Sequence, residues 1–235
     1  MKVTLENSIS HIQINSNGAY VDNFEVKDKS ILFPKLMVKI DDQLKLRGGM
    51  HVCAPNFGED KILNELDKHG FCRDLDWEIV EYRNDFAKLS LDGSESYENV
   101  KFLLEYKLDK SDLYASLTIK NKSKQRILVA PGFHPYFYVD QGPISINDST
   151  IDKSKLENSI VDKSKIASFV ANGKEIVVEA GQNINEFVFW SDFKGDYICV
   201  EPTYKSIAFS DSKRDAYKLE AGEDFIQDIK IKVIL

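Results

Sequence analysis

The sequence predicts an all-β protein, a large antiparallel β-sandwich. Three observations support this prediction: most segments alternate apolar and polar residues with a period of two, short turn sequences separate them, and helical periodicity is scarce. About fifteen or more strands are expected, which is too many for a small barrel and suits two large packed sheets. A chain of 235 residues is expected to form a single domain, residues 1–235, since all-β domains often reach this size.

The expected strands follow one another along most of the chain. Early strands are predicted at 9–14, 37–40 and 44–46, the last two joined by a turn at 41–43. An antiparallel meander follows, with strands at 77–82, 86–91, 100–108, 113–119 and 127–129 and turns at 92–94 and 121–123. After Pro143, strands are expected at 176–179, 186–190, 197–200 and near 225–235, the last after a turn at 220–223.

Two segments do not follow the alternating pattern of a strand. Residues 59–68 are the best helix candidate, because Ile62, Leu63 and Leu66 share a helical face, although an irregular segment is equally open. The tetrapeptide DKSK at 152–155 recurs at 162–165, and this echo favours a solvated hairpin over a repeat architecture, whose periods are roughly 20 residues or more.

Composition excludes several classes of protein. With 31 basic and 38 acidic side chains, a net charge of −7 and no dense basic stripe, the chain is not expected to bind nucleic acid or an anionic membrane. A small neutral or locally anionic ligand stays open. The N-terminus does not resemble a secretory signal, no apolar run approaches about 18 residues, and three cysteines without CxxC spacing argue against disulfides. A cytoplasmic protein is expected; the sequence leaves its oligomeric state open.

Two irregular segments carry arginines beside residues suited to a ligand. Residues 47–58 (RGGMHVCAPNFG) combine glycines and a proline with Arg47, a planar donor for oxygen atoms; a bulge with a surface arginine is the alternative. No phosphate-loop glycine spacing is present. His69, Arg73 and Trp77 could hold a polyol, with donors for hydroxyls and a flat face for ring carbons. The alternative is a loop histidine and a packed tryptophan.

Two further segments hold candidate proton-transfer groups. In residues 131–138 (PGFHPYFY), His134 sits within an aromatic run, and its ordinary pKa near 6.5 suits an acid or base; a structural histidine is the alternative. Glu201 ends an apolar strand, where a carboxylate is either functional or part of a core ion pair. No metal site is expected from His51, His69 and His134, because their spacing matches no metal motif.

Taken in order, these four segments resemble the aldose 1-epimerase (galactose mutarotase) superfamily, in particular its glucose-6-phosphate 1-epimerase-like branch. The resemblance rests on RGGMHVCAPNFG from residue 47, HGFCRDLDWEI from 69, PGFHPYF from 131, and VFWSD followed by CVEP ending at 202. It covers about two thirds of the chain. It implies a galactose mutarotase-like β-sandwich and an isomerase that needs no cofactor or metal.

The resemblance also implies roles for individual residues. His134 matches the general acid and Glu201 the general base that interconvert α and β anomers of a hexose or hexose 6-phosphate. Arg47 and Arg73 match arginines that contact substrate in the sugar-phosphate branch, and His69 matches a pocket histidine. The aspartate that binds sugar hydroxyls falls at Asp162, with Asp152 as the alternative.

Departures from the family leave the sugar and the activity open. His51 and Asn56 stand where the phosphate branch usually has a proline and an aromatic residue, and Lys68 stands where it often has glutamine. A carbohydrate-binding protein without turnover is the main alternative, and a structural protein using its concave sheet is another. For an active pair, mutual attraction is expected to raise the pKa of His134 and lower that of Glu201.

Overall fold

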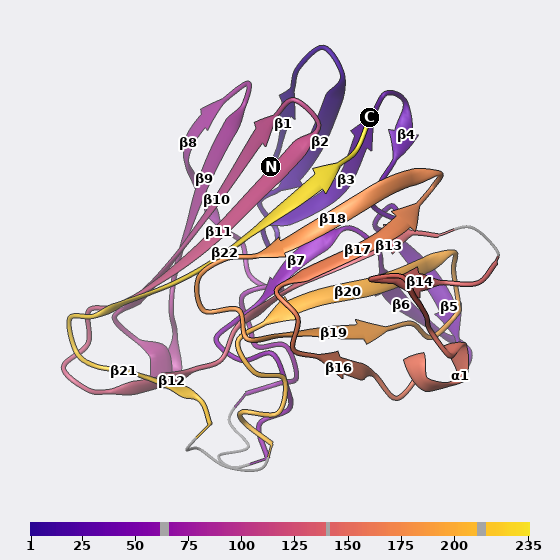
Figure 1. Cartoon of the computed structure of the whole chain (residues 1–235). Helices are drawn as coiled ribbons and strands as arrows, with labels where there is room; N and C mark the ends of the chain where they lie inside the picture. The colour runs from indigo at the N-terminus through magenta and orange to yellow at the C-terminus, as the bar shows by residue number, and fades with distance from the viewer. Residues whose placement is uncertain (62–65, 140–141, 211–214) are drawn as a thin grey trace.

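The alternating segments form two antiparallel sheets that pack against each other in the computed structural model (Figure 1). The structure describes residues 1–61, 66–139, 142–210 and 215–235. The larger sheet contains, in spatial order, β1 (Lys2–Glu6), β2 (Ser10–Asn15), β3 (Tyr20–Val26), β7 (Met50–Cys53), β13 (Gly132–Tyr138), β20 (Tyr197–Thr203), β19 (Glu186–Trp190) and β16 (Ile160–Asp162), and β4 (Lys29–Ser30) pairs with β3. This arrangement confirms the predicted all-β sandwich.

The second sheet contains four of the five strands of the predicted meander, and the fifth, at 127–129, lies outside it. Its spatial order is β17 (Ile166–Ala171), β18 (Lys174–Ala180), β22 (Asp224–Val233), β11 (Asp112–Asn121), β10 (Val100–Asp109), β9 (Phe86–Asp92) and β8 (Glu78–Arg83). Three two-stranded sheets complete the strands: β5 (Leu36–Ile40) with β6 (Gln43–Arg47), β12 (Ile127–Val129) with β21 (Tyr217–Leu219), and β14 (Ser145–Ile146) with β15 (Ser149–Thr150). Figure 1 shows the closing strand β22 between β11 and β18, and its bounds confirm the strand predicted near 225–235.

Helix is confined to two short turns in the described residues. The 3-10 helix η1 spans Glu95–Tyr97, and α1 spans Lys153–Leu156. The predicted hairpin at 152–165 is therefore wrong: Asp152 caps α1 by accepting the backbone N–H of Ser154 at 3.1 Å, and β16 follows as a strand of the larger sheet. The centre of the helix predicted at 59–68 lies outside the described residues, and residues 59–61 and 66–68 are not helical.

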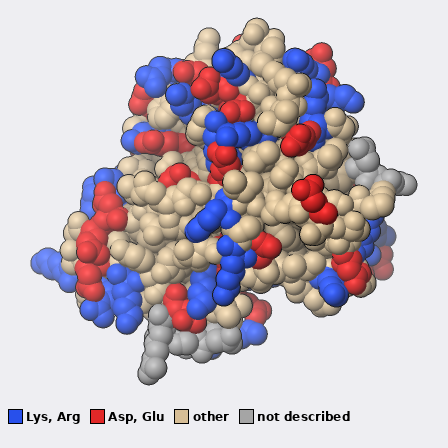
Figure 2. Space-filling view, viewed as in Figure 1, with Lys and Arg blue, Asp and Glu red and all other residues tan. Residues whose placement is uncertain are grey.

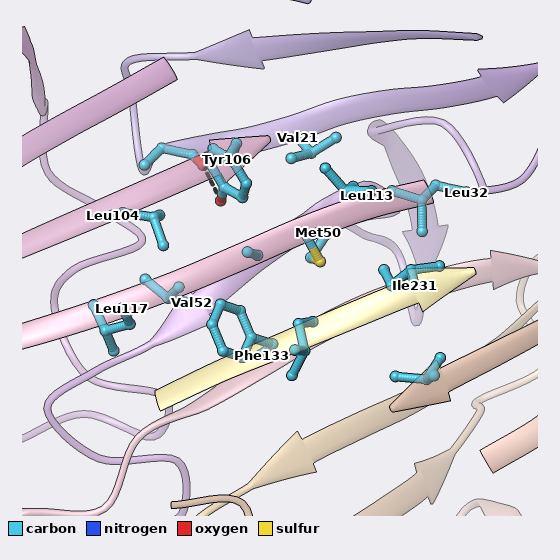
Figure 3. Packing of buried hydrophobic residues seen from close by; sticks show 14 of the residues in the cluster. Val21, Leu32, Met50, Val52, Leu104, Tyr106, Leu113, Leu117, Phe133 and Ile231 are labelled. Atoms are coloured by element: carbon cyan, nitrogen blue, oxygen red, sulfur yellow. Dashed lines mark hydrogen bonds between the residues drawn. The ribbon is translucent and has the colours of Figure 1, made fainter. Parts of the chain in front are cut away.

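The core fills the space between the sheets because alternate residues of each strand point inward. Figure 3 shows Met50, Val52 and Phe133 of the larger sheet packed with Leu117 and Ile231 of the smaller one. All five are fully buried. This packing determines which side chains of β7 and β13 point the other way, toward the outer face of the larger sheet.

Charge is mixed on the molecular surface. On the face shown in Figure 2, Lys and Arg side chains are interspersed with Asp and Glu. Within the described residues, no helix combines the length and apolar character needed to cross a bilayer. The three cysteines, Cys53, Cys72 and Cys199, are buried and unpaired.

Candidate active site

A cavity of about 420 Å³ opens on the outer face of the larger sheet. Residues on β3, β7, β13, β19 and β20 form its floor, and the β6 end and the segment 68–74 form its walls. The described residues that line it are Tyr20, Lys45, Leu46, Arg47, Gly48, His51, Phe57, Lys68, His69, Arg73, Asp74, His134, Tyr136, Ser159, Val188, Trp190 and Glu201. The cavity thus brings together five of the six residues predicted from the sequence.

Four side chains cross the cavity floor on four adjacent strands, in the order Glu201, His134, His51 and Tyr20. The register of β13 with β20 places His134 beside Glu201, and the two residues are 3.6 Å apart between Nε2 and Oε1. His134 lies directly opposite His51, whose ring is stacked on it at 4.9 Å between centroids. The Tyr20 ring packs against His51 at 4.7 Å between centroids, tilted by 32°. We call this set the four-residue row.

Period-two alternation explains why the row faces the cavity. Phe133 and Val52 point into the core, so their neighbours His134 and His51 point outward. On β20, Val200 lies in the core and Glu201 in the cavity. The four strands are central in the sheet, and this position keeps the polar groups out of bulk water.

His69 approaches the row from a loop rather than a strand. Its backbone is left-handed (φ 73°), and Gly70 follows with φ 63°. A Cβ atom on Gly70 would lie 2.1 Å from the carbonyl oxygen of Ala54, so glycine is required for the loop to pack here. The His69 ring meets His134 edge-on at 5.1 Å, which places it above the acid–base pair.

Arg47 is held by a carboxylate. Its Nε and Nη2 donate to Asp192 Oδ2 at 3.0 and 2.9 Å, and Nη1 donates to the backbone oxygen of Leu46. The guanidinium also lies 5.5 Å from the ring of Trp190. Because these contacts occupy its donor fork, Arg47 is less free to grip an anion than the sequence suggested.

Arg73 is the better anion-binding candidate. Its Nε is buried without a hydrogen-bond partner, and its ion pair with the exposed Asp74 is long, at 3.5 Å. Lys68 and Lys45 also line the cavity. Four cationic side chains therefore surround a cavity that holds two carboxylates, Asp74 and Glu201, although the whole chain is acidic.

Asp162 lies apart from this cluster. It ends β16, and its Oδ1 accepts the backbone N–H of Ser164 at 2.7 Å. Asp152 caps α1. Neither is among the described residues that line the cavity, so the structure does not bring either aspartate to the position that the resemblance implied.

Burial controls the protonation of Glu201 and His134, the predicted acid–base pair. It raises the pKa of Glu201 to about 8, with Lys68 opposing the shift. Burial also lowers the pKa of His134 well below its usual value, and His51, His69 and Arg73 lower it further. The expected mutual attraction between the pair is therefore outweighed by loss of solvent. The proton of the pair rests on Glu201 near neutral pH, 3.6 Å from His134.

The rate should depend on pH in a direction set by these shifts. Acid–base exchange requires Glu201 and His134 together to hold one proton. The pair loses this proton as Glu201 ionises around pH 8. It gains a second proton, on His134, only well below pH 6.5. We expect a broad plateau that falls above about pH 8. NMR exchange between anomers from pH 5 to 10, corrected for the spontaneous rate, measures the profile. A corrected rate that climbs from pH 8 to 10 would contradict this.

One group of side chains in the described residues has metal-ligating atoms close together. His134, Cys199 and Glu201 place one ligand atom each within 4.8 Å of one another. Cys199 is fully buried beside Tyr136 and Trp190, and the other two members are the acid–base pair itself. The absence of a metal requirement stays a prediction.

Sequence reasoning assigned no role to Tyr20, Lys45 or Ser159, which also line the cavity. Lys45 had a usable signal, because it precedes Arg47 by two residues on one strand and so shares its face. Tyr20 had none, since its place beside His51 depends on the pairing of β3 with β7.

A sequence profile of the aldose 1-epimerase family matches residues 1–172. The chain belongs to the aldose 1-epimerase family. The matched region contains His134, His69 and both cavity arginines, but it ends before Glu201. Glu201 nevertheless lies beside His134, because β13 and β20 are neighbours in the sheet.

Solved structures share this fold over almost the whole chain. The Slr1438 protein from Synechocystis sp. PCC 6803 is 21% identical, with a TM-score of 0.83 covering 99% of this chain and 95% of that one. A galactose mutarotase related enzyme from Lactobacillus acidophilus is 17% identical, with a TM-score of 0.81 over 100% and 98%. A galactose mutarotase-like protein from Lactobacillus casei ATCC 334 is 15% identical, with a TM-score of 0.82 over the whole of both chains. A search of curated proteins found no match.

Proposed function

We propose that the protein is an aldose 1-epimerase that interconverts the α and β anomers of a hexose or hexose 6-phosphate. The observation that carries this proposal is the placement of Glu201 and His134 side by side in the cavity, 3.6 Å apart. Family membership supports a mutarotase-like activity on a sugar. A protein that only bound sugar would not need a proton donor and a proton acceptor at one point of the ring.

The reaction needs one proton removed and one delivered. With the shared proton on His134, Glu201 takes the proton of the C1 hydroxyl while His134 gives one to the ring oxygen O5. The C1–O5 bond breaks, C1 becomes an aldehyde carbon, and rotation about C1–C2 exposes its other face. Closure then runs the two transfers in reverse. A proton resting on Glu201 must first pass to His134, and the 3.6 Å separation makes that transfer short.

Polarimetry on freshly dissolved α-D-glucose and α-D-galactose, and NMR exchange on glucose 6-phosphate, test the proposal. The protein should accelerate equilibration of at least one of these sugars. Binding without acceleration would instead support the carbohydrate-binding alternative.

Arg73→Ala distinguishes a sugar phosphate from a free sugar. Because Arg73 lines the cavity and its ion pair with Asp74 is long, we expect its guanidinium to bind the phosphate dianion. Its loss should raise KM for glucose 6-phosphate by about tenfold or more, and KM for glucose by less than about threefold. The exposed Arg126, which pairs with Glu220, offers Arg126→Ala as the matched control. Equal effects of Arg73→Ala on both sugars would remove the phosphate argument.

A further inference from the structure

His51 is a buried polar side chain for which the mechanism above has no use. It is 3% exposed, and neither Nδ1 nor Nε2 has a hydrogen-bond partner. Leaving both ring nitrogens buried and unpaired costs free energy that an apolar residue would not. A histidine that lines the cavity in this state is suited to a ligand that supplies the missing partner.

The surroundings of His51 leave one part of the ring available. His134 stacks on the ring at 4.9 Å between centroids, and the Tyr20 ring packs against it at 4.7 Å with a tilt of 32°. The ring edge is then the part of His51 left to contact a molecule in the cavity that this residue lines. Packing against these two rings also restricts rotation, so the His51 ring is held in position before a ligand arrives.

The order of the four-residue row relates His51 to one end of the sugar. In a pyranose, the ring oxygen O5 is bonded to C1 and to C5, so O1, O5 and the C5–C6 group follow one another along one edge. With O1 at Glu201 and O5 at His134, the next strand along the row presents His51. The ring edge of His51 therefore meets the C5–C6 group.

The position of Arg73 agrees with this direction. Among charged groups, Arg73 has the largest effect on the pKa of both His51 and Tyr20, whereas Lys68 acts on Glu201. The backbone of Arg73 packs against Gly18, two residues before Tyr20, where a Cβ atom would lie 2.1 Å from its carbonyl oxygen. The cation suited to a 6-phosphate thus lies at the His51 end of the row.

We propose that His51 is a specificity residue that hydrogen-bonds the oxygen on C6 of the sugar and so selects hexoses over sugars that lack this oxygen. The proposal rests on the proposed anomerase function, which sets the direction of the sugar in the cavity. It assigns His51 no proton transfer, because His134 and Glu201 supply both.

Comparing two sugars in two proteins isolates the contact. D-Glucose and 6-deoxy-D-glucose differ only in the C6 oxygen, and His51→Phe keeps a flat ring between Tyr20 and His134 while removing both nitrogens. We expect the wild type to favour glucose in kcat/KM by about tenfold, and His51→Phe to lose that preference through a higher KM for glucose alone. His11→Phe, at a half-exposed histidine on β2, is the matched control and should keep the preference.

Other outcomes overturn the proposal. An equal fall in kcat for both sugars would make His51 a residue that only positions His134. An unchanged preference in His51→Phe would mean that the C6 oxygen binds elsewhere. His51→Asn, which is smaller and retains polar atoms, repeats the comparison in case phenylalanine does not fit.

Direct binding separates this proposal from the proposed function. If the wild type accelerates neither sugar, the anomerase function fails, and calorimetric titration with the same two sugars still tests the contact. A loss of the affinity difference in His51→Phe would then uphold the role of His51. Absence of both turnover and binding for both sugars would overturn both proposals.

Discussion

Glu201→Gln and His134→Asn are each expected to slow enzymatic anomerisation by about 100- to 10,000-fold. Glutamine cannot take the proton of the C1 hydroxyl, and asparagine cannot deliver one to the ring oxygen. Both substitutions keep the approximate size of a side chain in the cavity floor, so the fold should survive. Rates for the best sugar, measured by NMR exchange at saturating concentration, provide the test.

Matched controls exist for both substitutions. Glu186 is a buried carboxylate on the neighbouring strand β19 that accepts hydrogen bonds from Ser206 and is outside the described cavity lining, so Glu186→Gln should retain activity. His11→Asn serves for the histidine. A folded Glu201→Gln or His134→Asn protein with a near-normal rate would refute the acid–base assignment.

The same Glu201→Gln substitution should make the protein more stable than the wild type, by an amount that increases with pH. The folded protein holds the Glu201 proton up to about pH 8, whereas the unfolded chain releases it near the ordinary value of 4.5. The contribution of Glu201 to stability is therefore fully present below pH 4.5 and is lost as the pH rises from there toward 8. Glutamine does not titrate, so its advantage should grow to a few kcal/mol across this window.

Thermal unfolding at pH 5 and pH 8 measures this effect. The difference in Tm between Glu201→Gln and the wild type should be larger at pH 8 by several degrees. Glu186→Gln controls for the loss of a buried carboxyl group elsewhere in the sheet. A Tm difference independent of pH would show that burial does not control the protonation of Glu201.

These two expected results have one physical origin. Placing a carboxyl group among buried strands costs stability, and the same burial keeps a proton available for transfer at neutral pH. A Glu201→Gln variant that is less active but more stable than the wild type would show directly that the buried carboxyl group lowers stability while it supports proton transfer.

The sequence by itself predicted the fold class, many of the strands and which of their residues share a face. It did not predict β7 or β13, which lie within the segments interpreted as irregular. Period-two alternation predicted the meander and the strand at 197–200, because burial on one side of a sheet imposes that period. The unusual residues of the irregular segments pointed to His134, Glu201, His69 and the two arginines, and the structure brings all five to one cavity.

Pairing between distant strands was decided only by the tertiary structure. Asp192, 145 positions along the chain, accepts the hydrogen bonds of Arg47. His51 stacks on His134 of the adjacent strand. Asp162 accepts the backbone N–H of Ser164 and does not line the cavity. Local pattern carries no information on such partners, since register depends on how two whole sheets pack. Burial likewise reversed the expected pKa shifts of the acid–base pair. Solvent exclusion is a property of the assembled sheet, and the sequence pattern around either residue does not contain it.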